Sequence, residues 1–318
     1  MMKTKRQIDQ LNNSRHNINF NFSEADTEQI SMKTKRQINQ LNNSLHNINF
    51  NFSETDTEQI LKINNFPPIF FNKNAGGKIQ KGSCNWMRNK HKNGSLHEPS
   101  TISAFSFIQQ NFANQINVIF DIGALYGYFS LISKSMFPQA TVFSFEMNPE
   151  SYSALVNNIN CNKHLGIPTS RCINMGLSNN TSLQKKVFCD KFTLIEDGES
   201  ENLAQIDIMS IDDFCRISGF FPDLIKLDVE GYQAKILSGG ENIIEKNKPI
   251  ILLEFDGQKQ LKRFDTTNKQ ITKFLFDLGY SCYWCKDQRT FQGEFQKLDY
   301  DKFTQEHEVN SLSIFLPN

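Results

Sequence analysis

Short apolar runs that end in or beside an acidic residue, separated by amphipathic segments, constrain the fold of this chain more than any other feature. They occupy residues 116–121, 140–146, 223–230 and 248–255. Strands that alternate with helices are joined by right-handed crossovers into a mostly parallel sheet with helices on both faces. The near-continuous apolar run at 248–255 indicates a strand buried on both faces. We therefore predict an α/β fold built on a doubly wound, mostly parallel sheet.

Two further runs, at 281–285 and 311–316, have no obvious crossover helix between them and predict a terminal antiparallel hairpin. Residues 98–113 carry apolar side chains at helical spacing and predict an amphipathic helix before the first strand. We expect the sheet domain to span residues 98–318, with residues 183–210 as an insertion.

The N-terminal part of the chain contains a tandem repeat. Residues 2–31 and 32–61 are identical at 26 of 30 positions, and the four exceptions are Asp9/Asn39, Arg15/Leu45, Ala25/Thr55 and Ser31/Leu61. Each copy reads as a polar helical piece, a short alternating stretch and a second helix start with capping-box spacing, at Ser23 and Ser53. Two copies are fewer than a self-supporting solenoid needs. We expect residues 1–61 to form a flexible accessory extension, with self-association or partner docking as its alternative role.

Residues 62–97 are rich in proline and glycine, which predicts irregular structure. We interpret this segment as a linker or lid. Its aromatic stretch at 66–71 is expected to pack on the domain that follows.

The charge balance excludes several classes of protein. The chain has 34 basic and 34 acidic residues, so it lacks the basic footprint of a nucleic-acid binder or a membrane-surface protein. It contains no run of about 18 apolar residues, and no apolar stretch follows the basic start, so we expect no membrane span and no secretory signal. The seven cysteines are scattered, and the single C-x-x-C at 282–285 lacks the second pair of a structural zinc site. We therefore expect a cytoplasmic protein without a metal.

Acidic residues recur where the predicted strands end. They are Asp121, Glu146, Asp228 with Glu230, and Glu254. In open α/β sheets, ligands bind at the carboxyl ends of the strands, near the switch in strand order. The repeated placement of acids there predicts a ligand site at this edge.

The turn after the first strand has the spacing G-x-x-x-G, at Gly123 and Gly127. A dinucleotide fold more often shows G-x-G-x-x-G, which brings backbone N–H groups onto a pyrophosphate. Here the middle glycine is missing, and Leu125 and Tyr126 would crowd a diphosphate. The turn favours a ligand without phosphate, such as S-adenosylmethionine. Glu146 follows the second strand, where an acid can accept hydrogen bonds from ribose hydroxyls.

The chain resembles the FkbM-type methyltransferases, which have the class I S-adenosylmethionine-dependent fold. The similarity rests on the segments VIFDIGALYGYFSL, VFSFEMNPESYSALVNNINCN, SIDDF, PDLIKLDVEGYQAKILSGG and KPIILLEF. It runs from about residue 98 to about residue 285, and its most specific part is I-K-L-D-V-E-G at 225–231. The family turn usually reads D-x-G-A-N-x-G, and Leu125 replaces the Asn. A proline often follows the family acid, and Met147 stands there instead.

The resemblance implies a set of cofactor residues. The turn would hold the methionine part of S-adenosylmethionine, Glu146 its ribose, and Met147 would lie on the adenine face. Residues 174–178 follow the third strand, where adenine contacts usually sit. The predicted cofactor residues are Asp121, Gly123, Ala124, Gly127, Glu146 and Met147.

Two acidic residues are candidates for positioning the methyl acceptor or for removing its proton. Transfer of a methyl group to an alcohol requires removal of the hydroxyl proton, so a general base helps. Asp228 is the first candidate and Glu230 the second, because both share strand parity with Lys226. In the alternative interpretation, one of them pairs with Lys226 or caps the helix that follows.

We predict an S-adenosylmethionine-dependent methyltransferase, with O-methylation of a sugar hydroxyl or a small metabolite as the family-level expectation. Its partner would be a small-molecule or glycan acceptor, with no nucleic acid and no membrane. Two alternatives remain open at this point. One is an NAD- or nucleotide-sugar-linked oxidoreductase on the same sheet, and the other is a non-catalytic binding protein with a decayed cofactor site.

Overall fold

The computed structural model describes residues 24–74, 78–92, 94–166, 170–190, 193–195 and 203–318. Most of the first repeat copy therefore lies outside the described residues. The chain divides into two units, Met1–Asn39 and Gln40–Asn318. The second unit holds every described strand and all the helices that follow α2. Within the described ranges, no helix combines the length and apolar character needed to cross a membrane.

An eight-stranded sheet forms the centre of the second unit, in the order β14-β13-β15-β12-β11-β4-β5-β6. The pairs from β12 to β6 are all parallel, which confirms the predicted doubly wound, mostly parallel architecture. Chain order reverses between β4 and β11, so the switch point lies between these strands. The parallel strands are β4 (Val118–Ile122), β5 (Thr141–Phe145), β6 (Ser170–Ile173), β11 (Leu224–Leu227) and β12 (Ile250–Phe255).

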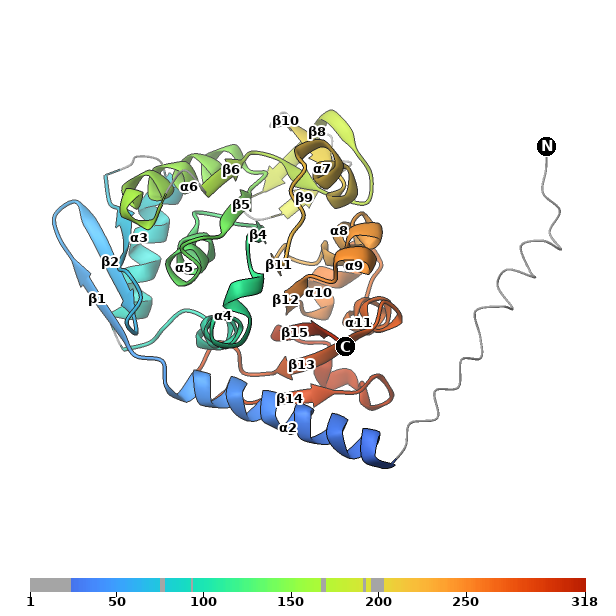
Figure 1. The fold of residues 1–318 in the computed structure, drawn as a ribbon. Helices are drawn as coiled ribbons and strands as arrows, with labels where there is room; N and C mark the ends of the chain where they lie inside the picture. The colour runs from blue at the N-terminus through green and yellow to red at the C-terminus, as the bar shows by residue number, and fades with distance from the viewer. Residues whose placement is uncertain (1–23, 75–77, 93, 167–169, 191–192, 196–202) are drawn as a thin grey trace, which may run out of the picture. The chain divides into compact units, whose positions relative to one another are not determined.

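Helices cover both faces of this sheet, with α4 and α5 on one side and α8, α9 and α11 on the other (Figure 1). The amphipathic helix predicted at residues 98–113 is confirmed as α4, and Gly239 and Gly240 separate α8 from α9. The bounds are α4 Pro99–Phe112, α5 Tyr128–Met136, α6 Pro149–Cys161, α7 Ile211–Ser218, α8 Gln233–Ser238, α9 Glu241–Asn247, α10 Gln258–Leu261 and α11 Asn268–Asp277.

The sheet is extended by antiparallel strands, as the terminal hairpin predicted. β15 (Ser311–Pro317) pairs with both β12 and β13 (Tyr280–Cys285). β14 (Phe295–Leu298) forms the edge, and such an edge carries unpaired backbone groups. The side chain of Asn42 satisfies two of them, since it accepts from the Phe295 N–H at 2.7 Å and donates to the Phe295 carbonyl at 3.2 Å.

The second repeat copy contributes helix and hairpin to the domain. Its polar piece forms the C-terminal part of α2 (Glu24–His46), and its remainder forms β1 (Phe50–Glu54) and β2 (Glu58–Ile63). The predicted helix start at Ser53 is wrong, because Ser53 lies within β1. The Thr55 hydroxyl instead accepts from the N–H groups of Thr57 and Glu58 and closes the hairpin turn.

One sequence adopts two secondary structures in this chain. Residues 23–31 and 53–61 share seven of nine residues, yet α2 begins at Glu24 whereas the later segment is a hairpin. The two differences favour this outcome, since Ala25 and Ser31 stand where the hairpin uses Thr55 and Leu61. Leu61 is fully buried (0% exposed), so the hairpin depends on tertiary packing that local sequence does not encode.

Residues 62–97 are more regular than predicted. β3 (Ile69–Asn72) joins β1 and β2 in a three-stranded antiparallel sheet, and α3 (Lys78–His91) follows. The prediction of irregular structure is therefore wrong for these two elements. Proline and glycine stand around them rather than at their centres, except for Gly82 within α3.

The predicted insertion at 183–210 and the preceding β7 form a small separate sheet in the order β7-β10-β8-β9. Its strands are β7 (Gly176–Leu177), β8 (Ser182–Asp190), β9 (Thr193–Ile195) and β10 (Leu203–Met209). β8 and β10 pair in antiparallel fashion.

We expect Leu61→Ser to lower the free energy of unfolding by about 2–5 kcal/mol, because it exchanges a buried leucine for the serine of the first copy. Asn39→Asp is the matched control: it is also a copy-to-copy exchange, but at an exposed position, and should change stability by less than about 0.5 kcal/mol. Urea denaturation measures both. Equal effects would contradict the role of Leu61 in docking the hairpin.

Candidate functional site

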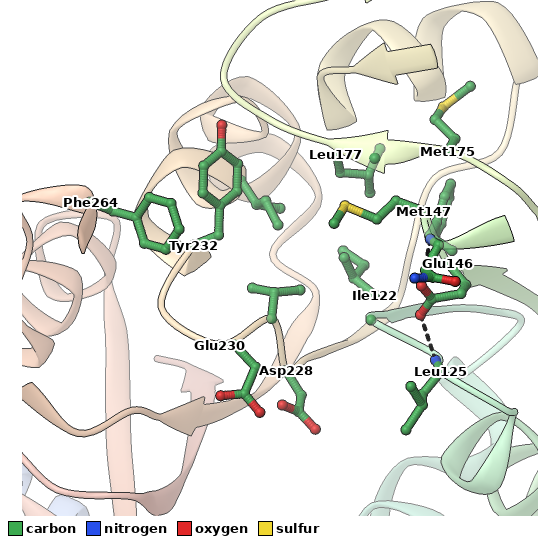
Figure 2. A pocket seen from close by; sticks show the side chains of 16 residues that line it. Ile122, Leu125, Glu146, Met147, Met175, Leu177, Asp228, Glu230, Tyr232 and Phe264 are labelled. Carbon is green, nitrogen blue, oxygen red and sulfur yellow. Dashed lines mark hydrogen bonds between the residues drawn. The ribbon is translucent and has the colours of Figure 1, made fainter. Parts of the chain in front are cut away.

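A cavity opens where the strand order reverses, at the carboxyl ends of β4, β5 and β11 (Figure 2). This is the location that open α/β sheets use for ligands. Five of the predicted site residues line it together: Gly123, Glu146, Met147, Asp228 and Glu230. The acids predicted at the ends of these three strands are thus gathered at one edge, apart from Asp121.

The turn after β4 needs its first glycine for close backbone approach. Gly123 has φ +80°, and a Cβ atom there would lie 1.9 Å from the backbone oxygen of Asp228. Gly127 has φ +88°, and a Cβ atom there would lie 2.8 Å from Cδ1 of Leu155. Both glycines are therefore required by the local backbone, before any ligand is considered.

The amide groups of this turn are already satisfied within the protein. The N–H groups of Gly123 and Ala124 both donate to the Phe145 carbonyl, at 3.1 and 3.0 Å. The Leu125 N–H donates to Glu146 Oε2 at 2.8 Å. A phosphate cradle needs free N–H groups that point at the anion, and these three are engaged elsewhere.

Leu125 has a backbone conformation that suits asparagine, the residue usual at this position of the family turn. Its φ is +50°, in the left-handed region. Asparagine tolerates this region because its short polar side chain bonds locally, whereas a leucine there is strained. The structure thus gives a backbone reason for the Asn of the family turn.

Glu146 lies at the end of β5 with its carboxylate against two backbone donors. Oε2 accepts from Leu125 and Oε1 from the Asn148 N–H, both at 2.8 Å. Burial nevertheless raises the pKa of Glu146 to about 7. A carboxylate offers about four acceptor positions, so two remain for ribose hydroxyls.

Apolar side chains line the part of the cavity beyond Glu146. Met147, Met175 and Leu177 lie close together there (Figure 2). Met175 and Leu177 belong to the segment 174–178 that was predicted near adenine. Asn174 supports the wall from behind, since its side-chain amide donates to the carbonyls of Glu146 and Met147. Thioether side chains adapt well to a flat aromatic ring.

Asp121, Ala124 and Gly127 do not line this cavity. Asp121 is buried beneath the turn, where its Oδ2 accepts from the Ser130 hydroxyl at 2.5 Å. Its Oδ1 lies 3.7 Å from Nζ of Lys226, the residue paired with it in the β4–β11 register. Its placement makes it a partner of Lys226, and direct contact with a cofactor stays a prediction.

Asp228 stands at the cavity wall as an ionised acid. Burial alone would raise its pKa, but Lys226 Nζ lies 3.1 Å from Oδ2 and the net effect lowers the pKa of Asp228 to about 2. Its side chain remains 24% exposed, so a ligand in the cavity can reach it. One carboxylate of the predicted pair is therefore charged and accessible.

Glu230 reaches the cavity by a different route from the one predicted. The strand ends at Leu227, so strand parity does not extend to Glu230. Instead Glu230 has φ +53° in a turn with Gly231 (φ +103°), and its carboxylate lies beside that of Asp228 (Figure 2). Burial and the neighbouring Asp228 raise its pKa. A strained backbone that aims an acid into a cavity is typical of functional sites.

Sequence reasoning missed several residues around Asp228. Tyr232 and Phe264 line the cavity opposite Met147 with ring centroids 4.9 Å apart. Glu98, just before α4, is a further buried acid near Asp228, and its Oε1 lies 3.3 Å from Nε2 of the half-buried His97. No sequence motif marks the two aromatic residues. Pro99 at the first position of α4, however, is a signal that could have placed Glu98 at the start of a helix.

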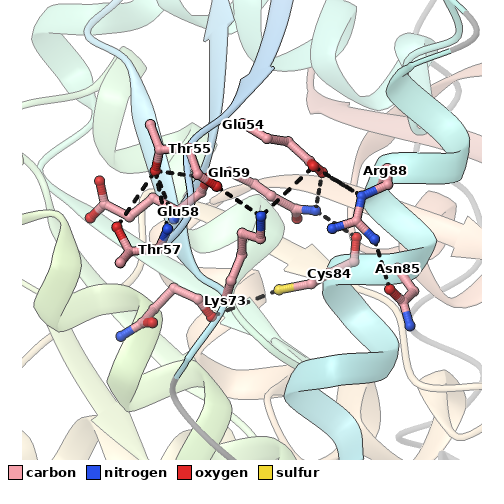
Figure 3. Close-up of polar contacts among 10 residues, drawn as sticks. Glu54, Thr55, Thr57, Glu58, Gln59, Lys73, Cys84, Asn85 and Arg88 are labelled. Atoms are coloured by element: carbon pink, nitrogen blue, oxygen red, sulfur yellow. Dashed lines mark hydrogen bonds and ion pairs between the residues drawn. The ribbon is translucent and has the colours of Figure 1, made fainter.

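The N-terminal strands and α3 support the turn from behind. In the contacts of Figure 3, Glu54 accepts from Arg88 at 2.8 Å and Gln59 donates to the Cys84 carbonyl at 2.7 Å, which fastens α3 to the hairpin. The buried Asn158 then links this layer to the site, since it accepts from the Asn72 N–H and donates to the Tyr126 carbonyl.

These features define a class I methyltransferase fold with its ligand cavity at the switch point. The family model of the methyltransferase FkbM domain matches residues 121–282, about half of the chain. The chain belongs to the FkbM methyltransferase family, which confirms the predicted resemblance. The methyl donor of this family is S-adenosylmethionine, as predicted.

Solved structures with this fold are similar to the chain at low identity. A methyltransferase FkbM from Methylobacillus flagellatus shares 16% identity over 68% of this chain, with a TM-score of 0.42, and the match spans 53% of that protein. Fibrillarin from Aeropyrum pernix, with bound S-adenosylmethionine, shares 11% identity over 85% of this chain and 99% of its own, with a TM-score of 0.39. An O-methyltransferase from Bacillus cereus, in complex with SAH, shares 11% identity over 74% of this chain and 89% of its own, with a TM-score of 0.41. No curated protein matches the chain.

We expect Leu125→Asn to stabilise the protein by about 1 kcal/mol, because asparagine accepts the left-handed conformation at lower cost. Leu125→Ala is the control, since it removes the same side chain but keeps the strain. Thermal denaturation compares the two variants. If both change the melting temperature equally, strain at this position is not the cause.

Proposed function

We propose that this protein transfers the methyl group of S-adenosylmethionine to a hydroxyl oxygen of a sugar or a small metabolite. The observation that carries the proposal is that Glu146 and Asp228 line one cavity at the switch point of a methyltransferase sheet. The first can hold a ribose, and the second can face the acceptor.

The residues present fit the methyl donor along the whole cavity. Glu146 would accept from the ribose hydroxyls, and Met147 would pack on the adenine together with Met175 and Leu177. The turn that contains Gly123, Ala124 and Gly127 would hold the methionine part, and Asp121 would act beneath it. When bound, S-adenosylmethionine supplies a methyl carbon activated by a positively charged sulfur.

A dinucleotide suits this site less well. The N–H groups of Gly123, Ala124 and Leu125 donate to protein acceptors, so they cannot also surround a pyrophosphate. Membership of a methyltransferase family points the same way. These two observations favour methyl transfer over the oxidoreductase alternative.

The acceptor side is defined by two carboxylates and two aromatic rings. Asp228 and Glu230 can accept hydrogen bonds from hydroxyl groups, and Tyr232 with Phe264 offers an apolar surface to a ring. Asp228 would receive the acceptor proton as the new C–O bond forms. Its low pKa does not prevent this, because a hydroxyl oxygen that gains a methyl group becomes far more acidic than a carboxylic acid.

The cellular compartment and the class of acceptor are also part of the proposal. We place the enzyme in the cytoplasm with a small-molecule or glycan acceptor. It stays a prediction that the repeat at residues 1–61 mediates self-association. The division of the rest of the chain into a linker or lid at 62–97 and a methyltransferase domain at 98–318 also stays a prediction. A labelled-methyl transfer screen against glycans and small metabolites would identify the acceptor.

The pKa of Glu146 predicts how cofactor affinity depends on pH. Ribose hydroxyls bind best to the ionised carboxylate, so binding of S-adenosylhomocysteine competes with a proton whose pKa is about 7. Affinity should be full above this pH and fall by up to about tenfold for each unit below it. Glu146→Gln should bind about tenfold or more weakly at high pH, with a flatter pH profile.

Calorimetric titration with S-adenosylhomocysteine measures both proteins across this range. Other groups that titrate nearby are unchanged in the variant, so the difference isolates Glu146. Identical profiles would contradict the ribose assignment. Absence of binding to the wild-type protein at millimolar concentration would favour a decayed site.

Asp228→Asn should reduce turnover by about 10²- to 10⁴-fold, because the acceptor proton loses its destination. Its dissociation constant for S-adenosylhomocysteine should change far less. Radiolabelled methyl transfer and calorimetry measure the two quantities, and Glu230→Gln serves as the neighbouring control. Equal losses in turnover and affinity would move Asp228 to the cofactor side.

A further inference from the structure

A second carboxyl group lies directly behind Asp228, on the neighbouring strand. Glu254 of β12 is 8% exposed, and the parallel register that pairs Leu227 with Leu253 sets Glu254 beside Asp228, with the two side-chain carboxyl groups within hydrogen-bonding reach. Its Oε1 accepts from Gln288 Nε2 at 2.8 Å, while the guanidinium of Arg289 is more distant at 3.5 Å. Gln288 therefore helps to hold the Glu254 carboxyl group in place.

Two carboxyl groups in hydrogen-bond contact must hold a proton between them, since two carboxylates would repel and offer no donor. The surroundings decide which group carries it. Lys226 is buried and lies 3.1 Å from Asp228, whereas the nearest cation to Glu254, Arg289, is 58% exposed. The negative charge therefore stays on Asp228 and the proton on Glu254.

We propose that Glu254 is a positioning residue that shares one proton with Asp228 and holds its carboxylate ready for the acceptor hydroxyl. This inference rests on the proposed function, because it adds a residue to the same site. As the acceptor oxygen bonds the methyl carbon, the carbon–sulfur bond breaks and its electron pair stays on sulfur. The acceptor proton passes to Asp228, and the pair returns one proton to water afterwards.

The local charge also defines the class of acceptor. Lys226 is shared between the carboxylates of Asp121 and Asp228, and the carboxyl group of Glu230 lies beside Asp228 (Figure 2), so acidic groups outnumber the buried cation there. Such a site favours a reacting group that arrives neutral and carries its proton, which is an alcohol. An acceptor that arrives as a carboxylate or phenolate would be repelled.

Several other groups face the pair and enter its titration. Burial and the nearby carboxylates raise the pKa of Glu254 well above its usual value, and burial raises those of Glu98 and Asp256 to about 7. The titratable and charged groups around the pair are His97, Glu98, Asp121, Lys226, Glu230, Asp256 and Arg289. Because these neighbours also titrate, the test compares variants rather than reading one pH profile.

Carbon-13 NMR of the full chain, with labelled carboxyl groups on Asp and Glu, tests the shared proton directly. We expect one glutamate signal that stays protonated at neutral pH and disappears in Glu254→Gln. In Asp228→Asn the pKa of that signal should fall, because the neighbouring negative charge is gone. A Glu254 that is ionised at neutral pH, or whose titration ignores Asp228→Asn, would overturn the proposal.

Turnover gives a second readout. Glu254→Gln keeps a donor beside Asp228 and should retain activity within about threefold at neutral pH, whereas Glu254→Leu should lose about tenfold or more. Glu308→Gln is the matched control, since Glu308 is an equally buried glutamate (8% exposed) that caps α11. Equal turnover in the Gln and Leu variants would contradict the positioning role.

Binding of S-adenosylhomocysteine separates this inference from the proposed function. It should be unchanged in both Glu254 variants. If the wild-type protein fails to bind, the proposed function itself fails, whatever the NMR titration shows. If it binds and the two carboxyls titrate independently, only the role of Glu254 is refuted.

Discussion

This site depends on the ion pairs that the buried ammonium group of Lys226 makes with Asp121 and Asp228. The lysine is buried at the switch point, with Asp121 opposite it in the β4–β11 register and Asp228 two residues further along the chain. A buried charge is costly unless it is paired, and removing one partner leaves the other uncompensated. The lysine thus holds Asp121 beneath the turn and keeps Asp228 ionised at the cavity wall.

The turn and the second acid follow from the same strand ends. Close approach of Gly123 to the Asp228 backbone brings the β4 turn against the end of β11, and the Leu125 amide then bonds Glu146 across to β5. Three strand ends are therefore linked to one another before a ligand arrives. Preorganisation of this kind is what allows a site to hold reacting atoms in line.

Much of the fold was predictable because its signals are local and periodic. Apolar strands, helical spacing and glycine turns placed β4, β5, β11 and β12 and the edge where Glu146 and Asp228 meet. The failures came where tertiary contacts decide. Ser53 has the spacing of a helix cap, yet Thr55 and Leu61 make a hairpin. The sequence also does not show that Asp121 lies beside Lys226 beneath the turn. Glu254 was visible as a strand-end acid, but only the register of β11 and β12 shows that it lies beside Asp228.

The most direct test of the account is a crystal structure of the complex with S-adenosylhomocysteine. We expect the ribose hydroxyls on the Glu146 carboxylate, the adenine against Met147, and the sulfur turned towards Asp228. A nucleoside bound elsewhere, or with its ribose remote from Glu146, would contradict the central claim that this edge of the sheet holds the methyl donor.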